Sequence, residues 1–289
     1  MGNITDKEVL KIREKANDIR QSIIEMLLEA GSGHTAGPLG MSDIFAYLYF
    51  YELNHDPQKP DWEERDRLVL SNGHINPVLY ATMAHSGYFP VDELMTLRKL
   101  GSRLQGHPHR EFLPGIETSS GPLGSGISQA LGMVLADRIN SGKTSNKFFY
   151  CLTGDGELQE GQNWEAIMVA AKYKPHNLIV IVDRNNIQID GYTEDVLPLN
   201  ALNDKFAAFN WHVQEIDGHN IEAIDNAIHQ AKAIFDMPSV IIANTIPGKG
   251  VSDFERLPVW HGKPPNEEEA KKALKDLRTL RGKIESEHE

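Results

Sequence analysis

Cysteine, long apolar runs and clustered basic residues are all scarce in this sequence of 289 residues. The single cysteine, Cys151, cannot form a disulfide within the chain, so we expect a reducing compartment, the cytoplasm. It lies in an apolar run, which favours a buried strand residue over a catalytic thiol. No apolar stretch approaches the roughly 20 residues of a membrane-spanning helix, and the charged N-terminus is unlike a signal peptide. We therefore expect a soluble protein with no membrane partner.

The charge balance is acidic, with 29 basic and 41 acidic residues, a net charge of -12 and a pI near 5.5. Binding to a nucleic-acid backbone needs clustered Lys and Arg, so nucleic acid is excluded as the main partner. Small phosphorylated ligands are not excluded, because they need only one local site. The length and the hydrophobic fraction of 40% suffice for a sizeable core.

Apolar runs joined by helical segments dominate the second half of the chain. These strand, helix and strand segments are expected at 148–152, 158–172 and 178–182, and again at 213–216, 221–235 and 240–244. Continuous apolar strands joined by helices are typical of a parallel sheet covered on both faces. We therefore predict a doubly wound, mainly parallel α/β fold that forms a single domain over residues 1–289.

The other predicted elements come from helical periodicity and from glycine and proline content. They are a helix from Thr5 or Asp6 to Gly31, a Gly-rich loop 31–40, a helix 42–53, a short strand 69–70 and a helix 125–140. Residues 101–126 and 247–265 are rich in Gly and Pro and are expected to be irregular, which is typical of functional loops. A charged amphipathic helix is expected after Glu267, with its apolar face formed by Ala273, Leu277, Leu280 and Ile284.

Polar residues follow two of the predicted strands. One strand ends in Gly154-Asp155-Gly156, and the next ends in Asp183-Arg184-Asn185-Asn186, so that Asp155 and Asn185 are 30 positions apart. A right-handed crossover places both strand ends at the same edge of the sheet, where ligands bind. Carboxylate and amide oxygens suit Mg²⁺, and the glycines allow a diphosphate to approach the backbone. The alternative reading is two polar turns without a ligand.

At these residues the sequence resembles the thiamine diphosphate motif, and the individual motif residues are similar to those of the transketolase family. The shared motifs, in the family's order, are Ser32-Gly33-His34, Ser71-Asn72-Gly73-His74, Gly106-His107-Pro108, Gly121-Pro122-Leu123-Gly124-Ser125-Gly126, Asn185 to Gly191 and His261-Gly262. The resemblance implies thiamine diphosphate as cofactor and Mg²⁺, or Ca²⁺ or Mn²⁺ in its place. It also implies three metal ligands, namely the side chains of Asp155 and Asn185 and the backbone carbonyl of Ile187.

The same resemblance implies roles for four histidines in Gly- and Pro-rich loops. His34, His107 and His261 would face the substrate and move protons, and His74 would contact the diphosphate. The loop Gly121-Pro122-Leu123 would let the cofactor approach the backbone. Glu160 and Glu165 match family acids at a subunit interface near the cofactor, although acids are also favoured at the start of any helix.

The chain departs from the family pattern at two places. Ser125 stands where the family usually has Gln, and Thr35-Ala36-Gly37 differs from the residues that commonly follow the first histidine. Two more histidines, His109 and His219, are left open, and the latter follows an Asp-Gly pair that is common in turns. The remaining histidines are interpreted as structural or solvated: His55, His85, His176, His212, His229 and His288.

In transketolases the glutamate that activates the cofactor belongs to a second, pyrimidine-binding domain, which this sequence does not contain. The resemblance therefore implies the N-terminal subunit of a split transketolase, active on sugar phosphates only with a separate C-terminal subunit in a heterotetramer. Three alternatives stay open. One is a related thiamine enzyme such as deoxyxylulose-phosphate or dihydroxyacetone synthase, another is a transketolase specialised for an unusual sugar phosphate, and the third is a non-catalytic cofactor-binding relative.

Overall fold

The computed structural model describes residues 4–141 and 145–280 and contains a five-stranded parallel sheet. Its strands lie in the order β1-β2-β3-β7-β6. Their bounds are Arg67–Leu70 for β1, Phe149–Gly154 for β2, Leu178–Arg184 for β3, His212–Asp217 for β6 and Ser239–Asn244 for β7. In the register of β2 and β3, Gly154 pairs with Asp183, so the polar ends of these two strands lie side by side. The predicted parallel sheet is confirmed.

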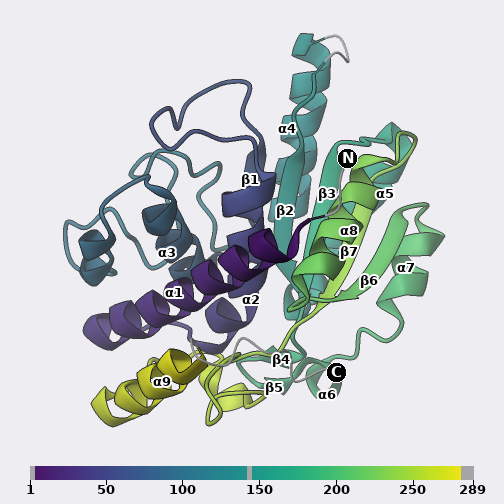
Figure 1. Ribbon diagram of the computed structural model, residues 1–289. Coiled ribbons are helices and arrows are strands. Elements are labelled where there is room, and N and C mark those ends of the chain that lie inside the picture. Colours follow the sequence, from purple (N-terminus) through teal and green to yellow (C-terminus); the bar gives the residue numbers. More distant parts are fainter. Residues whose placement is uncertain (1–3, 142–144, 281–289) are drawn as a thin grey trace.

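Helices cover both faces of the sheet (Figure 1). One layer consists of α1 (Asp6–Ala30), α2 (Ala36–Tyr47), α3 (Asn76–Ser86) and α8 (Ile221–Lys232), and the other consists of α4 (Gly126–Ser141), α5 (Gly161–Tyr173) and α7 (Leu202–Ala208). Alternate residues of each strand enter the two cores. In β2, Tyr150 and Leu152 pack in the first core, and Phe149 and Cys151 pack in the second. This is the doubly wound arrangement that the sequence predicts, and the cysteine is buried as expected.

The first helix begins and ends where the sequence signals place it. The Thr5 side chain accepts a hydrogen bond from the Glu8 backbone N–H, and the Glu8 carboxylate accepts one from the Thr5 backbone, which forms a capping box. Gly31 ends the helix in the left-handed conformation with φ 61°. The last turns of the C-terminal helix α9 (Glu267–Leu280) pack against α1, where Asn17 Nδ2 donates to the Leu277 carbonyl over 3.1 Å.

Three predicted boundaries are wrong. The Gly-rich segment is helical from Ala36 onward, not from residue 42, and all twelve residues of α2 are buried. Burial against α1 and the neighbouring loops outweighs the low helix propensity of its glycines, and Pro38 is tolerated in the first turn. This helix continues as a π-helical turn, η1 (Leu48–Glu52), to near the predicted end. In addition, α5 begins at Gly161 after a 3₁₀ turn, η4 (Gly156–Gln159), and α8 ends at Lys232.

Several elements were not predicted, most of them short. They are η2 (Gly73–Ile75), α3, η3 (Val91–Thr96), the hairpin β4–β5 (Ile187–Gln188 and Gly191–Tyr192), α6 (Thr193–Val196), α7 and η5 (Pro258–Trp260). Residues 101–125 and 247–265 are irregular as expected, apart from η5. Ile284 and His288 lie outside the described residues. Among those described, no helix has the length and apolar character needed to cross a membrane. The single-domain organisation stays a prediction.

Candidate active site

A cavity of about 350 Å³ lies at the carboxyl ends of β1, β2 and β3. Its lining residues come from these strand ends, from the loops that follow α1 and η3, from the hairpin β4–β5 and from the segment after η5. They are His34, Asn72, His74, His107, Gly121, Leu123, Gly154, Asp155, Gly156, Glu157, Asp183, Asn185, Ile187, Gln188, Ile189, Asp190 and His261. Parallel α/β sheets bind ligands at this edge. All four histidines singled out in the sequence therefore meet in one cavity.

Three of these histidines form a tight cluster. The ring centroids of His34 and His74 are 4.8 Å apart, those of His74 and His261 are 5.3 Å apart, and those of His34 and His261 are 5.5 Å apart. They come from positions far apart in the chain: His34 precedes α2, His74 lies in the turn after β1, and His261 follows η5. His107 reaches the same cavity from the long irregular loop before α4.

Burial keeps these imidazoles neutral. Desolvation, with a smaller contribution from the neighbouring His261, lowers the pKa of His34 to about 4. Desolvation also lowers the pKa of His261 to about 4, against an opposing hydrogen bond at the Ile187 backbone, and it holds the pKa of His74 well below the ordinary value. At His107 desolvation and the nearby Arg98 guanidinium both lower the pKa. The site thus presents neutral imidazoles at neutral pH.

Asp155 is buried at the end of β2, with only 1% of its surface exposed. Its carboxylate accepts hydrogen bonds from the backbone N–H groups of Gly156 and Asn186, each over 2.7 Å, and from the Thr193 hydroxyl over 3.2 Å. The Arg184 guanidinium supplies a positive charge 3.0 Å from Oδ2. Desolvation raises the pKa of Asp155, and Arg184 opposes that rise.

The segment after β3 holds its oxygen atoms in a fixed arrangement. Asp183 accepts a hydrogen bond from Asn185 Nδ2 over 2.7 Å, which orients the Asn185 Oδ1 atom toward the Ile187 N–H at 3.0 Å. Asn186 adopts the left-handed conformation with φ 59°, so its N–H reaches Asp155 while its carbonyl accepts from the Thr193 N–H over 3.1 Å. Asp155, Asn185 and Ile187, the three predicted metal ligands, therefore line the same cavity.

Glu157 is a site residue that the sequence interpretation missed. Its buried carboxylate accepts hydrogen bonds from the Ser71 hydroxyl, from Thr153 Oγ1 over 2.8 Å, and from the backbone N–H groups of Gly124 and Gly154 over 2.6 Å and 3.1 Å. Desolvation raises its pKa, and these bonds oppose the rise. One carboxylate therefore connects the end of β1, the end of β2 and the loop 121–126. Its place next to Gly-Asp-Gly was the only available signal.

The remaining predicted residues divide into two groups. Gly121, Leu123, Gly154 and Gly156 line the cavity, and Pro122 stands between the first two. Glu160 is exposed at the N-cap of α5 and does not line it, and Glu165 is exposed on the same helix. The Ser125 hydroxyl donates to the Pro122 carbonyl over 2.8 Å, so it acts within its own loop.

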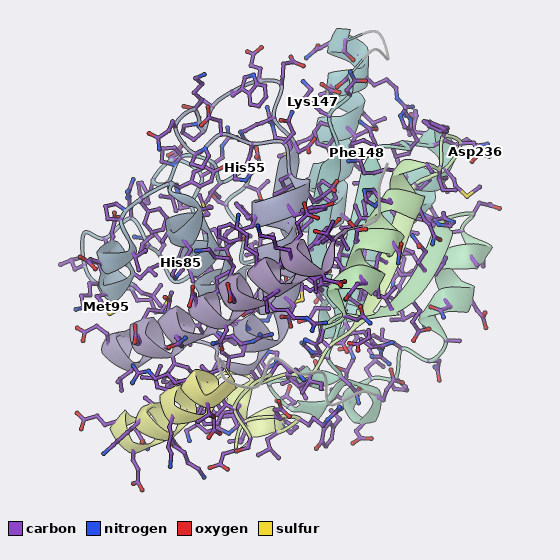
Figure 2. The ribbon with its side chains drawn as sticks, in the orientation of Figure 1. His55, His85, Met95, Lys147, Phe148 and Asp236 are labelled. Atoms are coloured by element: carbon purple, nitrogen blue, oxygen red, sulfur yellow. The ribbon has the colours of Figure 1, made fainter. Side chains whose placement is uncertain are left out.

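The other described histidines lie away from the cavity. Figure 2 shows His55 and His85 on the α3 side of the molecule. His55 bonds the Tyr88 hydroxyl and the Tyr49 carbonyl, and His85 bonds the Ser22 hydroxyl over 2.9 Å, so both are structural. His109, which the sequence left open, stacks on Phe112 with ring centroids 4.3 Å apart.

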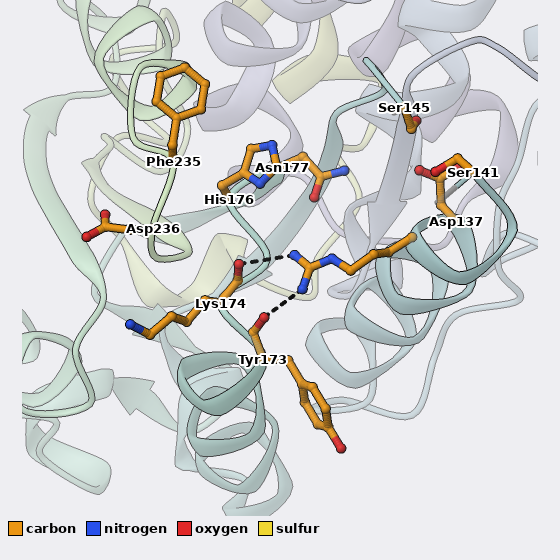
Figure 3. A pocket seen from close by; sticks show the side chains of 10 residues that line it. Asp137, Ser141, Ser145, Tyr173, Lys174, His176, Asn177, Phe235 and Asp236 are labelled. Carbon is orange, nitrogen blue, oxygen red and sulfur yellow. Dashed lines mark hydrogen bonds between the residues drawn. The ribbon is translucent and has the colours of Figure 1, made fainter. Parts of the chain in front are cut away.

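A second cavity, of about 390 Å³, lies near the amino ends of β2 and β3 (Figure 3). Its Arg138 guanidinium donates to the carbonyls of Tyr173 and Lys174 over 2.7 Å and 3.1 Å and so caps the C-terminal end of α5. This edge of a parallel sheet is not the one that binds ligands in such folds. The cavity at the carboxyl edge is therefore the candidate active site.

Comparison with known proteins agrees with this geometry. The family model described as "Transketolase, thiamine diphosphate binding domain" matches residues 12–280. The 6-deoxy-6-sulfo-D-fructose transketolase subunit SqwG of Clostridium sp. is 43% identical over 94% of this chain and 98% of its own length. An apulose-4-phosphate transketolase subunit from Actinobacillus succinogenes is 39% identical over 93% of this chain and 96% of its own length.

A solved structure shows the same fold. Transketolase from Leishmania mexicana superimposes with a TM-score of 0.88 at 34% identity, over 92% of this chain but only 41% of that longer chain. The chain thus spans about two fifths of the Leishmania mexicana transketolase chain and nearly the full length of the two relatives named as transketolase subunits. The chain belongs to the transketolase family, as an N-terminal subunit that carries the thiamine diphosphate-binding domain.

Proposed function

We propose that this subunit binds the diphosphate of thiamine diphosphate through a divalent metal and, with a separate C-terminal subunit, transfers a two-carbon ketol unit from a ketose phosphate to an aldose phosphate. The observation that carries this proposal is the convergence of His34, His107 and His261 with Asp155 and Asn185 in one cavity. A metal pair alone would fit many phosphate-binding proteins. The added neutral imidazoles fit a reaction that takes protons from sugar hydroxyls and returns them.

The cavity residues fit the cofactor. Several buried polar atoms on its wall have no hydrogen-bond partner among the described residues, namely Asn72 Oδ1, Gln188 Nε2 and the Nδ1 atoms of His34 and His261. Buried polar atoms are normally satisfied, so unpaired atoms around one cavity favour a polar ligand. The glycines that flank Asp155 at the end of β2 let a diphosphate approach the backbone closely.

The metal would be held by the Asp155 carboxylate, Asn185 Oδ1 and the Ile187 carbonyl. Within residues 4–141 and 145–280, no group of three or more His, Cys, Asp or Glu side chains could hold a metal ion. A metal at this site would therefore need further oxygen ligands from a diphosphate and from water. This mixed set of oxygen ligands suits Mg²⁺, and we propose Mg²⁺ with Ca²⁺ or Mn²⁺ as substitutes.

Thiamine diphosphate, when bound, supplies the carbanion chemistry of the reaction. The chain's own residues bind it, exclude water from its surroundings and move protons. With pKa values of about 4, His34 and His261 are neutral at neutral pH and can accept a proton from a substrate hydroxyl. We assign His107 to the same work and His74, the most strongly desolvated of the four, to contact with the diphosphate.

Exposed apolar side chains lie on the hairpin β4–β5, whose Ile189 lines the cavity, on α6 and on the segment around η5. They include Ile189, Tyr192, Val196, Leu197, Leu257 and Val259, of which Ile189 and Val259 are 66% and 64% exposed. Apolar surface of this kind favours a protein partner. We propose that the pyrimidine-binding C-terminal subunit docks here and that the two chains form a heterotetramer. We also propose a cytoplasmic location, which fits the single, buried and unpaired Cys151.

The substrate class follows from the relatives only in part. The two relatives named above act, by their names, on 6-deoxy-6-sulfo-D-fructose and on apulose-4-phosphate. Both are anionic sugars, and we propose an anionic ketose, with a phosphate ester as the first choice. A chain specialised for an uncommon sugar of this class is the second candidate, and a panel of ketose phosphates and sulfonates as donors separates the two.

Two experiments test the proposal. The purified chain is assayed with thiamine diphosphate, Mg²⁺, a ketose phosphate and an aldose phosphate, with and without the C-terminal subunit. Turnover should need both chains, and substantial turnover by this chain alone would contradict the two-chain proposal. In calorimetry of the assembled complex, Asp155→Ala should abolish metal-dependent cofactor binding, whereas Asp204→Ala, an exposed acid on α7 that does not line the cavity, should retain it.

A further inference from the structure

His219 lies outside the cavity and is not explained by the proposed function. It follows β6 at the carboxyl edge of the sheet, and its backbone N–H donates to Asp217 Oδ1 over 2.9 Å. Its side chain is only 10% exposed. The sequence presents it as part of a common turn, yet the structure gives both of its ring nitrogens close partners.

The two hydrogen bonds of the ring determine its tautomer. The backbone N–H of Ile246 can only donate, and it lies 2.7 Å from His219 Nε2, so Nε2 accepts and carries no proton. The proton is then on Nδ1, which donates to Asp43 Oδ2 over 2.7 Å. A single imidazole thus connects α2 to the segment that leaves β7.

The Asp43 end of this connection is firmly anchored. Burial alone would raise the pKa of Asp43, but the Arg20 guanidinium and the His219 hydrogen bond outweigh it and hold that pKa well below its usual range. Arg20 Nη2 lies 2.5 Å from Asp43 Oδ2, and Arg20 Nε donates to the Leu39 carbonyl over 3.1 Å. The Asp43 carboxylate on α2 is therefore held in place by Arg20 on α1.

The Ile246 end begins the segment 246–263, which carries His261 into the cavity. This segment lies so close to α2 that a Cβ atom on Gly40 would be 3.0 Å from the Ile246 carbonyl oxygen. About one turn of α2 earlier the contact is repeated, because the Gly248 N–H donates to the Ala36 carbonyl over 2.8 Å. The far end is tied next to His34, where Thr35 Oγ1 donates to the Lys263 carbonyl over 2.6 Å.

We propose that His219 is a positioning residue, which sets the placement of His261 relative to His34 by holding the Ile246 N–H. The inference rests on the proposed function, because it assigns those two imidazoles to proton transfer. A misplacement of about 1 Å at reacting groups can reduce turnover by about 100-fold. The Ile246 bond, rather than the Asp43 bond, is the part that reaches the active site.

Two substitutions separate the two bonds. His219→Gln places an oxygen near the position of Nε2 and can still accept from Ile246, whereas His219→Asn places an amide nitrogen near Nδ1 and can donate only to Asp43. His212→Asn, at the start of β6, is the matched control for the loss of an imidazole next to the same strand. Thermal melting of each variant identifies any that does not fold.

The readouts are turnover of the assembled two-chain enzyme and the ¹⁵N ring shifts of labelled histidines. We expect His219→Asn to lower kcat about tenfold or more with KM changed less than about threefold, and to shift the His261 ring signals. His219→Gln should keep kcat within about threefold of the unaltered chain. Equal losses in both variants, or an unchanged kcat and an unchanged His261 signal in His219→Asn, would overturn the proposal.

A failure of the proposed function is recognisable separately. If the unaltered chain and its partner transfer no ketol unit, the assigned reaction is wrong. The ring signals of His34 and His261 still report whether His219→Asn moves them and His219→Gln does not. In the unaltered chain the His219 signals should show a protonated Nδ1 and an unprotonated Nε2, and the reverse tautomer would also refute the assignment.

Discussion

Replacing Arg184 by methionine should destabilise the metal-free protein by removing the positive charge beside a buried carboxylate. Asp155 is 1% exposed and lies 3.0 Å from the Arg184 guanidinium, whose side chain is 17% exposed. Removing one partner of a buried ion pair lowers the free energy of unfolding by about 3–5 kcal/mol. We expect a loss of about 3 kcal/mol, because Asp155 keeps three other hydrogen-bond donors. In a chain of this size about 3 kcal/mol corresponds to a decrease of about 6 °C in melting temperature.

The assay is calorimetric melting at neutral pH, with a chelator and then with Mn²⁺ plus thiamine diphosphate. Arg184→Lys, which keeps the charge, is the matched control and should lose less than half as much stability. The double variant Asp155→Asn/Arg184→Met should be more stable than the sum of the single losses predicts, by about 2 kcal/mol, because the buried carboxylate that Arg184 compensates is then absent. If the metal binds at Asp155, cofactor and metal should reduce the loss in Arg184→Met, since the metal then supplies the missing charge. Additive losses within about 0.5 kcal/mol would refute the reasoning.

Three further predictions concern the same edge of the sheet. Glu157→Gln should lower the free energy of unfolding by about 1–3 kcal/mol in melting experiments, because one amide oxygen cannot accept from all four donors. The control Glu160→Gln, at an exposed side chain, should change it by less than about 0.5 kcal/mol. The two cavity histidines whose pKa values are about 4 should keep neutral ring signals down to about pH 5 in NMR titration. These pKa values lie below the unfolded value of about 6.5, so the two neutral histidines contribute to stability above about pH 6.5, and this contribution is lost as the pH falls toward 4. A melting temperature that rises on acidification over this range would contradict the prediction. Gly124→Ala should lower the stability of the fold by at least about 1 kcal/mol, because φ at this residue is +87° and the new Cβ would lie 2.7 Å from the Glu160 Cβ. The control is Gly132→Ala in α4, which has open space around it and should be neutral or stabilising by up to about 1 kcal/mol.

The sheet and its ligand edge could be predicted because their signals are local. Apolar runs of five residues, 148–152 before Gly154-Asp155-Gly156 and 178–182 before Asn185, indicate buried parallel strands and their polar ends without any knowledge of the partners. Right-handed crossovers then place both ends at one edge. The convergence of four loop histidines followed from the family motifs, not from periodicity.

What the sequence did not reveal depends on contacts between distant segments. Glu157 and Ser71 are 86 positions apart, and His219 and Asp43 are 176 positions apart, so no local pattern could pair them. The start of α2 was missed for a related reason: its glycines have low helix propensity, and only burial against other elements makes them helical. The role of Glu160 stays a prediction, since an exposed acid at a helix start is compatible both with a subunit interface and with a solvated surface.

The left-handed conformation of Asn186 has a thermodynamic consequence for whatever binds beside it. A hydrogen bond to Asp155 and hydrogen bonds from the Thr193 and Glu194 N–H groups already fix this residue in the protein without any ligand. The conformational entropy of the segment is therefore lost when the chain folds, and little remains to be lost on binding. A metal and diphosphate that bind here should show a small ordering entropy, and a Val or Ile at position 186, which resists positive φ, should weaken their binding without touching a ligand atom.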